Sequence, residues 1–191
     1  TIFDKTVNSV DGVVSLKPIL SLSDAKKIDR VVLLGMGTSY NAATIGRRFF
    51  EGLAKTPSEA DNSSEFRYRD PLIDSNTLVL SITQSGETAD TLAAMETAKQ
   101  KNCFQVVICN QVGTQATRMA DISLFINAGQ EIGVAATKTF TNTLVCLYLF
   151  AASLGHQKGV LTDNQIDSLV KEVSHLPSIV EKLLANQHEY I

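Results

Sequence analysis

Short apolar runs alternate with segments of helical spacing along most of the chain. Runs with the length and β-branched content of strands lie at 30–36, 59–61, 77–83, 104–110 and 121–128, the second being the weakest. Apolar residues recur at helical intervals in 39–55, in 88–101 and from about 133 to 154. The pattern therefore predicts strands and helices in alternation.

Each predicted strand is a nearly continuous apolar run, which is typical of a parallel sheet covered on both faces. Five strands are too few for a closed eightfold barrel. We therefore expect an α/β fold, with a doubly wound, flavodoxin-like parallel sheet in the order 2-1-3-4-5, helices on both faces and flanking helices at the termini. The expected organisation is an N-terminal helical flank at 1–29, one domain at 30–155 and a C-terminal amphipathic segment at 156–191.

The C-terminal segment carries apolar residues at helical spacing from Ile166 to Leu184. Pro177 interrupts it, so we expect the helix to bend or restart there. Such an apolar stripe either packs on its own domain or faces a partner or second domain, and the sequence does not separate the two.

Composition and charge narrow the function classes. The 191 residues are 44% hydrophobic and 19% charged, with a formal net charge of −3, which is typical of a globular protein without a basic surface for nucleic acid. The longest apolar run, 144–152, is much shorter than the roughly 20 residues of a membrane span. The N-terminus lacks the features of a signal peptide, so we expect a cytoplasmic location.

The three cysteines, Cys103, Cys109 and Cys146, lie in or beside apolar runs without CxxC spacing. This placement predicts reduced core thiols. No group of His, Cys or Asp has the spacing of metal ligands, so we expect neither a metal nor another cofactor.

Two loops combine glycine with hydroxyl side chains at the start of a predicted helix. They are GMGTSYN at 35–41 and TQSGETADT at 83–91, which follow the first and third predicted strands. In the 2-1-3-4-5 order these strands flank the switch point, where ligands bind beyond the carboxyl ends of the strands. Hydroxyls and helix N-terminal amides hold a phosphate without a cationic side chain. We expect a small phosphorylated metabolite at this point.

Two other interpretations compete with this one. Serine and threonine are common helix N-caps, so either loop alone could be serving only as a cap. Gly35 and Gly37 also begin a GxGxxG dinucleotide motif, but Tyr40 stands at the third glycine position. The motif GxxxxGK[ST] is missing, which disfavours a nucleoside triphosphate.

A third polar loop, NAGQEIGVAATK at 127–138, follows the fifth predicted strand. Glu131 in this loop is a candidate proton carrier or ligand of a sugar hydroxyl. The alternative is a carboxylate that stabilises the start of the long helix that follows. Glu87 has the same ambiguity at the helix of 88–101.

Several motifs in succession resemble one family. LGMGTSYNAA, SEFRYRDP, SITQSGETADTL, ICNQ and NAGQEIGVAATKTFTNTL, within 28–155, are similar to the first sugar-isomerase (SIS) module of glucosamine-6-phosphate synthases, the isomerizing glutamine–fructose-6-phosphate aminotransferases. The resemblance implies an enzyme that converts fructose 6-phosphate to glucosamine 6-phosphate with glutamine-derived ammonia. It also implies a homodimer with a second SIS module and a glutaminase domain as partners, both absent from this chain.

The resemblance further implies which residues contact the sugar phosphate. Phosphate contacts are implied for Thr38, Ser39, Thr83, Gln84, Ser85 and Thr88. The loop from Val134 to Lys138 would approach the sugar. Thr83 and Ala136 stand where the family commonly has serine, so one sugar-contacting hydroxyl is missing at Ala136.

The resemblance places the main catalytic groups in the absent second module and tail. The residues support this independently, because a ketose-to-aldose shift needs a base near C1 and C2 and a ring-opening acid, and no convincing set is present. We therefore expect the module alone to be inactive. The alternative function is a free-standing SIS sensor that recognises a sugar phosphate and regulates a partner.

Overall fold

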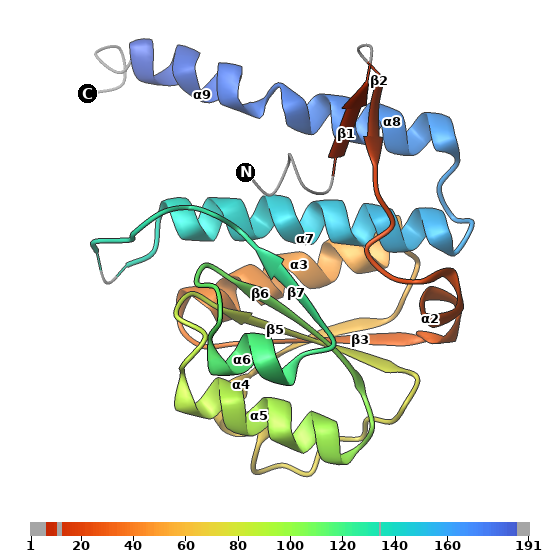
Figure 1. Ribbon diagram of the computed structural model, residues 1–191, viewed down its shortest axis with the longest axis vertical. Coiled ribbons are helices and arrows are strands. Elements are labelled where there is room, and N and C mark those ends of the chain that lie inside the picture. The colour runs from red at the N-terminus through yellow and green to blue at the C-terminus, as the bar shows by residue number, and fades with distance from the viewer. Residues whose placement is uncertain (1–6, 11–12, 134, 187–191) are drawn as a thin grey trace.

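The computed structural model describes residues 7–10, 13–133 and 135–186. Its centre is a five-stranded parallel sheet, seen edge-on in Figure 1. The strands are β3 (Arg30–Gly35), β4 (Ser58–Asn62), β5 (Thr77–Thr83), β6 (Phe104–Cys109) and β7 (Ile122–Phe125). Their spatial order, β4-β3-β5-β6-β7, confirms the predicted 2-1-3-4-5 winding.

The central strands are apolar on both faces because helices cover both faces. Every residue of β5 is buried. β5 pairs in parallel with β3 on one side, where Leu78 lies opposite Val31, and with β6 on the other, where Leu80 lies opposite Val106. This arrangement explains why the strand runs are continuous rather than alternating.

The helices divide between the two faces of the sheet (Figure 1). Packed together on one face are α3 (Thr38–Leu53) and α7 (Lys138–Gln157). The other face carries α4 (Ser63–Phe66), α5 (Ala89–Gln100) and α6 (Gln115–Met119). On the first face Phe50 and Phe150 meet edge to face, with ring centroids 5.5 Å apart.

The N-terminal flank is not helical throughout, so that expectation was wrong for its first part. β1 (Val7–Val10) and β2 (Val13–Leu16) form an antiparallel hairpin, followed by the short helix α2 (Leu22–Lys27). Four of the eight strand residues are valine, and β-branched side chains favour strand over helix. Ser21 caps α2 by accepting a hydrogen bond from the Asp24 N–H.

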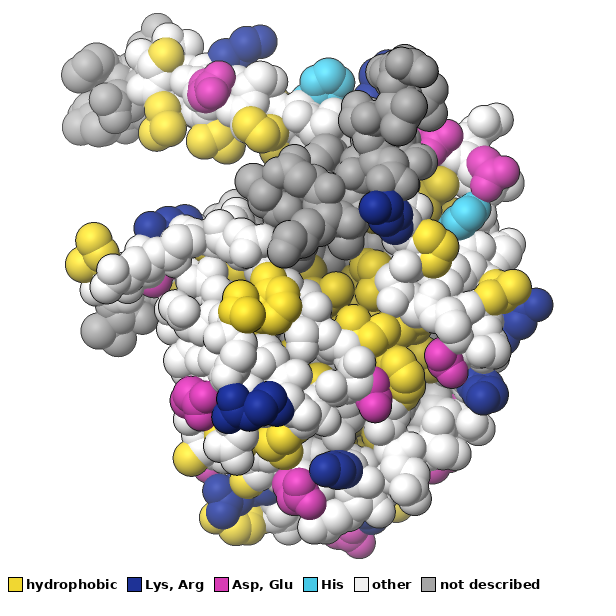
Figure 2. All heavy atoms as spheres, in the orientation of Figure 1, with side chains coloured by type: hydrophobic (Ala, Val, Ile, Leu, Met, Phe, Trp, Pro, Cys, Tyr) yellow, Lys and Arg dark blue, Asp and Glu magenta, His cyan; other side chains and the backbone are white. Residues whose placement is uncertain are grey.

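The C-terminal segment restarts as predicted near Pro177. α8 (Asp163–Ser174) opens with a capping box between Thr162 and Gln165, and α9 (Leu176–Ala185) has proline in its first turn. α8 buries Ile166 and Val170 against α7. α9 buries no residue, and Figure 2 shows hydrophobic side chains along the side of this arm that faces the body of the molecule.

The expectation of buried, reduced thiols is confirmed, since Cys103, Cys109 and Cys146 are free and buried. Burial raises the pKa of the Cys103 thiol to about 11, so this cysteine is protonated at neutral pH. Within the described residues no helix is both long and apolar enough to span a membrane. In the same part of the chain, no three His, Cys, Asp or Glu side chains are grouped as metal ligands.

Candidate functional site

The loops that follow β3 and β5 meet at the carboxyl edge of the sheet, where they line a cavity of about 230 Å³. The third polar loop closes the cavity from the side of α7. Eight of the nine candidate site residues line it: Thr38, Ser39, Thr83, Gln84, Ser85, Thr88, Glu131 and Ala136. The ninth, Val134, lies outside the described residues.

The loop after β5 is shaped by its own hydroxyls. Thr83 Oγ1 accepts a hydrogen bond from the Gly86 N–H at 3.1 Å, and Ser85 Oγ accepts one from the Glu87 N–H at 3.2 Å. Gly86 has a φ of +71°, and a Cβ at this position would lie 2.1 Å from Thr114 Oγ1. Only glycine fits here without a shift of the neighbouring chain.

Two helices begin at the cavity wall, α3 after Gly37 and α5 after Thr88. At both N-termini no side chain makes a capping hydrogen bond. The hydroxyl of Thr88 is therefore not used as a cap, which was the simpler interpretation of this loop. Thr38 and Ser39 of α3 and Thr88 and Thr91 of α5 line the cavity, so the positive ends of both helix dipoles lie at its wall, a setting that favours an anion.

Glu131 is held by the start of α7. Its carboxylate accepts hydrogen bonds from the backbone N–H groups of Thr137 (3.2 Å) and Thr139 (3.1 Å) and from both hydroxyls, that of Thr139 at 2.7 Å. These bonds, those from Thr139 most of all, lower the pKa of Glu131 to about 2. These contacts support the helix-stabilising role, and the lowered pKa makes the Glu131 carboxylate a weaker base than an ordinary glutamate.

Glu87 also acts as a cap, but for a different helix from the one expected. Its Oε1 accepts a hydrogen bond from the Gln115 N–H at 2.8 Å, at the start of α6. In a second hydrogen bond, the Ala116 N–H donates to Gly86 O at 3.1 Å. The loop after β5 is thereby fixed to the loop after β6.

Asn110 joins the loop after β5 to the third loop. Its Nδ2 donates to Gly129 O at 2.7 Å, its Oδ1 accepts from the Ala128 N–H at 2.9 Å, and its own N–H donates to Gln84 O at 3.3 Å. Sequence reasoning missed this residue, although a polar side chain directly after a buried strand was a signal. It likewise missed Thr91, which lines the cavity one helical turn after Thr88.

The cavity has no cationic side chain among its lining residues, and Glu131 is their only charged member. Because four hydrogen bonds satisfy its carboxylate, the remaining polar surface is made of hydroxyls, an amide and backbone. His156 lies away from this cavity, 2.7 Å from Asp163 Oδ1. The arrangement suits an anionic group flanked by hydroxyls, but it contains no acid–base pair for isomerisation.

An open, doubly wound parallel sheet with polar loops at its switch point defines the class of α/β domains that bind ligands beyond the carboxyl ends of their strands. The chain belongs to the SIS domain family, whose model matches residues 22–153.

Its relatives identify one branch of that family. The chain is 42% identical over 186 residues to the isomerizing glutamine–fructose-6-phosphate aminotransferase of Methanosarcina mazei, covering 97% of this chain and 30% of that protein. It is 46% identical over 162 residues to the enzyme of the same name from Thermococcus kodakarensis, covering 84% and 27%. The chain thus spans under a third of the length of these relatives.

A solved structure agrees with the sequence comparison. The C-terminal domain of glucosamine-fructose-6-phosphate aminotransferase from Francisella tularensis superposes with a TM-score of 0.90 at 35% identity, covering 98% of this chain and 52% of that one. The chain is therefore a SIS domain homologous to the isomerase part of glucosamine-6-phosphate synthase.

Proposed function

We propose that the chain is the sugar-phosphate-binding SIS module of a glucosamine-6-phosphate synthase, which makes glucosamine 6-phosphate from fructose 6-phosphate and glutamine-derived ammonia. The observation that carries the proposal is the cavity at the carboxyl edge. It joins hydroxyls from two loops to two helix N-termini and has no cation among its lining residues. The names of the relatives supply the substrate and the reaction.

The phosphate of the sugar occupies the space between the loops after β3 and β5. Ser39, Ser85 and Thr88 donate their hydroxyl protons to its oxygens, and the first amides of α3 and α5 add the helix dipoles. The sugar extends toward Gly133 and Ala136 in the third loop, which Glu131 holds in place. Ala136 offers no hydroxyl to it.

The module alone does not turn the sugar over. A ketose–aldose shift needs a base with a pKa near the working pH, and the cavity offers only Glu131, with a pKa near 2. The base and the ring-opening acid therefore come from a second SIS module, and ammonia from a glutaminase domain. We also propose that the protein is cytoplasmic and dimeric, with the exposed apolar side of α9 pairing with a like module.

The double substitution Ser85→Ala with Thr88→Ala tests the proposed phosphate site. Hydrogen bonds to a charged group contribute about 1.5 kcal/mol each or more, so losing two weakens fructose 6-phosphate binding by roughly 100-fold. Calorimetric titration measures the affinity. Thr97→Ala, on the same helix but outside the cavity, is the matched control and keeps the wild-type affinity. Equal affinity in the double variant and the control would refute the site.

A further inference from the structure

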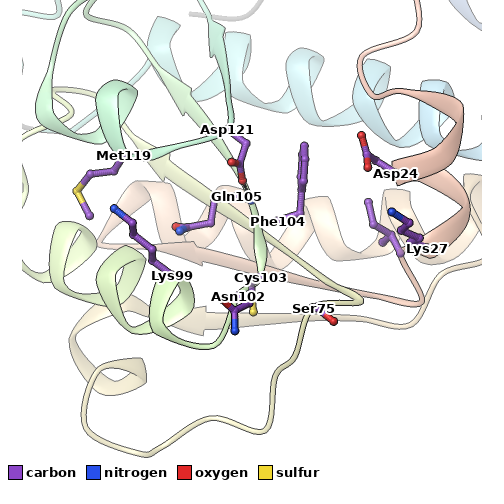
Figure 3. Close-up of a pocket in the computed structure, with 11 residues that line it drawn as sticks. Asp24, Lys27, Ser75, Lys99, Asn102, Cys103, Phe104, Gln105, Met119 and Asp121 are labelled. Carbon is purple, nitrogen blue, oxygen red and sulfur yellow. Dashed lines mark hydrogen bonds between the residues drawn. The ribbon is translucent and has the colours of Figure 1, made fainter.

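A second cavity, of about 400 Å³, lies at the opposite, amino-terminal edge of the sheet (Figure 3). It surrounds the start of β6, where Phe104 faces the α3 and α7 side and Gln105 the other. Four further lining residues come from neighbouring elements: Lys27 from α2, Lys99 from α5, Met119 from α6, and Asp121, which directly precedes β7. None of its lining residues belongs to the cavity at the carboxyl edge.

Gln105 interrupts an otherwise apolar strand, FQVVIC, and its side chain is only 3% exposed. Its backbone is fixed from both sides, since its N–H donates to Asp121 Oδ2 at 2.8 Å and its C=O accepts from the Asp121 N–H at 2.9 Å. Yet the buried Oε1 has no hydrogen-bond partner among the described residues. Buried amide groups in native proteins are rarely left in this state.

Charged groups of both signs surround this amide. In Figure 3 the Lys99 side chain and the Gln105 amide extend toward the same side of the cavity, Asp121 lies next to Gln105, and Phe104 separates them from Lys27. The ion pairs between described residues involve none of Lys27, Lys99 and Asp121. α5 ends here, and its carbonyl end favours a positive group.

We propose that this cavity binds a small zwitterion, a molecule that carries both an ammonium group and an acidic group. The ammonium is held by Asp121 and, once the Gln105 amide rotates toward the cavity, by Gln105 Oε1, which gains its missing donor, while Lys99 holds the acidic group. Phe104 and Met119 cover the carbon skeleton. The volume lies within the range of about 300–1,000 Å³ that is typical of small-molecule sites. Two classes of small molecule carry both an ammonium group and an acidic group: α-amino acids and amino-sugar phosphates.

The test is a titration of the 191-residue chain, in separate arms, with L-glutamine, L-glutamate and glucosamine 6-phosphate. Every sample contains saturating fructose 6-phosphate, which lacks an ammonium group and fills the other cavity. The readout is the side-chain amide signal of Gln105 in a ¹H–¹⁵N spectrum. We expect at least one zwitterion to shift this signal saturably, and the arm that does so identifies the source.

Two variants assign the effect to this cavity. Gln105→Leu removes the acceptor and retains the volume, and Lys99→Met removes the cation. Each variant is expected to lower the affinity for the zwitterion, measured by calorimetric titration, at least tenfold. Lys171→Met, on the exposed side of α8, is the matched control and binds as the wild type does. The proposal is overturned if no zwitterion shifts Gln105, or if both variants keep the wild-type affinity. Fructose 6-phosphate binding, measured alone, decides the proposed function independently.

Discussion

Gly86 shows how strongly one residue constrains the proposed site. Its left-handed φ of +71° and its closeness to Thr114 leave no room for a side chain. We predict that Gly86→Ala lowers the free energy of unfolding by about 2 kcal/mol or more, through backbone strain and the clash together. Urea unfolding measures the change. Gly52→Ala is the control, because its Cβ meets nothing within 4 Å on the exposed side of α3, and it gains about 0.5–1 kcal/mol. Equal stabilities would contradict this account.

Glu131 controls the third loop through its four hydrogen bonds. We predict that Glu131→Gln, which removes the charge, speeds amide hydrogen exchange in a peptide spanning 129–141, because the N–H groups of Thr137 and Thr139 lose a charged acceptor. Glu96→Gln, exposed on α5, is the control and leaves this exchange unchanged.

The pH dependence of the same contact has a defined sign. Folding lowers the pKa of Glu131 from 4.5 to about 2. The contribution of the ionised carboxylate to the stability of the loop is therefore fully present above pH 4.5 and is lost as the pH falls through 2. Protection of this loop, corrected for intrinsic exchange, therefore stays constant between pH 7 and pH 5. A loss of protection within that interval would show that another group holds the loop.

Most of the candidate residues of the cavity could be found from sequence because glycine and hydroxyl side chains come soon after the buried strands β3 and β5. The roles of Glu131 and Glu87 could not. Glu131 lies six residues before Thr137, which it contacts, and Glu87 caps α6, whose first residue is Gln115. Both contacts depend on the path of a loop that carries no periodic pattern.

Among the helices of the part of the chain that the structure describes, α9 is the one that buries no side chain in the core. Its apolar side consists of half-exposed or more exposed side chains: Leu176, Ile179, Val180, Leu183 and Leu184. An amphipathic helix with this much exposed apolar surface is typical of an interface. The sequence left own-domain packing and partner contact open, and the structure shows that α8 takes the first role and α9 does not.

We predict that Ile179→Glu with Leu183→Glu, one turn apart on this side of α9, shifts the chain from a dimer to a monomer in sedimentation velocity, because two buried charges oppose association. Lys182→Glu on the same helix is the control for added negative charge. A wild-type chain that stays monomeric at all concentrations, or a double variant that still dimerises, would exclude α9 as the interface.

The edge strand β4 shows why the weakest element was hard to delimit. Its sequence, SEADN, is polar, and all five residues are only half-buried. It pairs with β3 at the edge of the sheet, where Glu59 contacts Arg30 at 3.0 Å and Asp61 contacts Arg69 at 2.6 Å. Because its residues are polar and only half-buried, β4 lacks the continuous apolar run from which the other strands were predicted.

At the scale of the whole molecule, the alternation of strands and helices was sufficient to predict the winding of the sheet. Three of the four crossovers join neighbouring parallel strands, and the connection from β4 to β5 passes over β3. The N-terminal hairpin was not predicted. Leu16 of β2 packs beside Ile166 and Val170 of α8, a contact between opposite ends of the chain that local periodicity does not encode. The flank is thereby held to the C-terminal segment and lies away from the carboxyl edge of the sheet (Figure 1).

We propose that the hydroxyl cavity recognises the phosphate of a sugar phosphate without a cationic side chain. The most direct measurement is calorimetric titration of the chain with fructose 6-phosphate, glucosamine 6-phosphate and unphosphorylated fructose, followed by an isomerisation assay of each mixture. We predict binding of the two phosphorylated sugars, no binding of fructose, and no turnover. Failure of both phosphorylated sugars to bind, or equal binding of fructose, would show that this cavity is not a phosphate site.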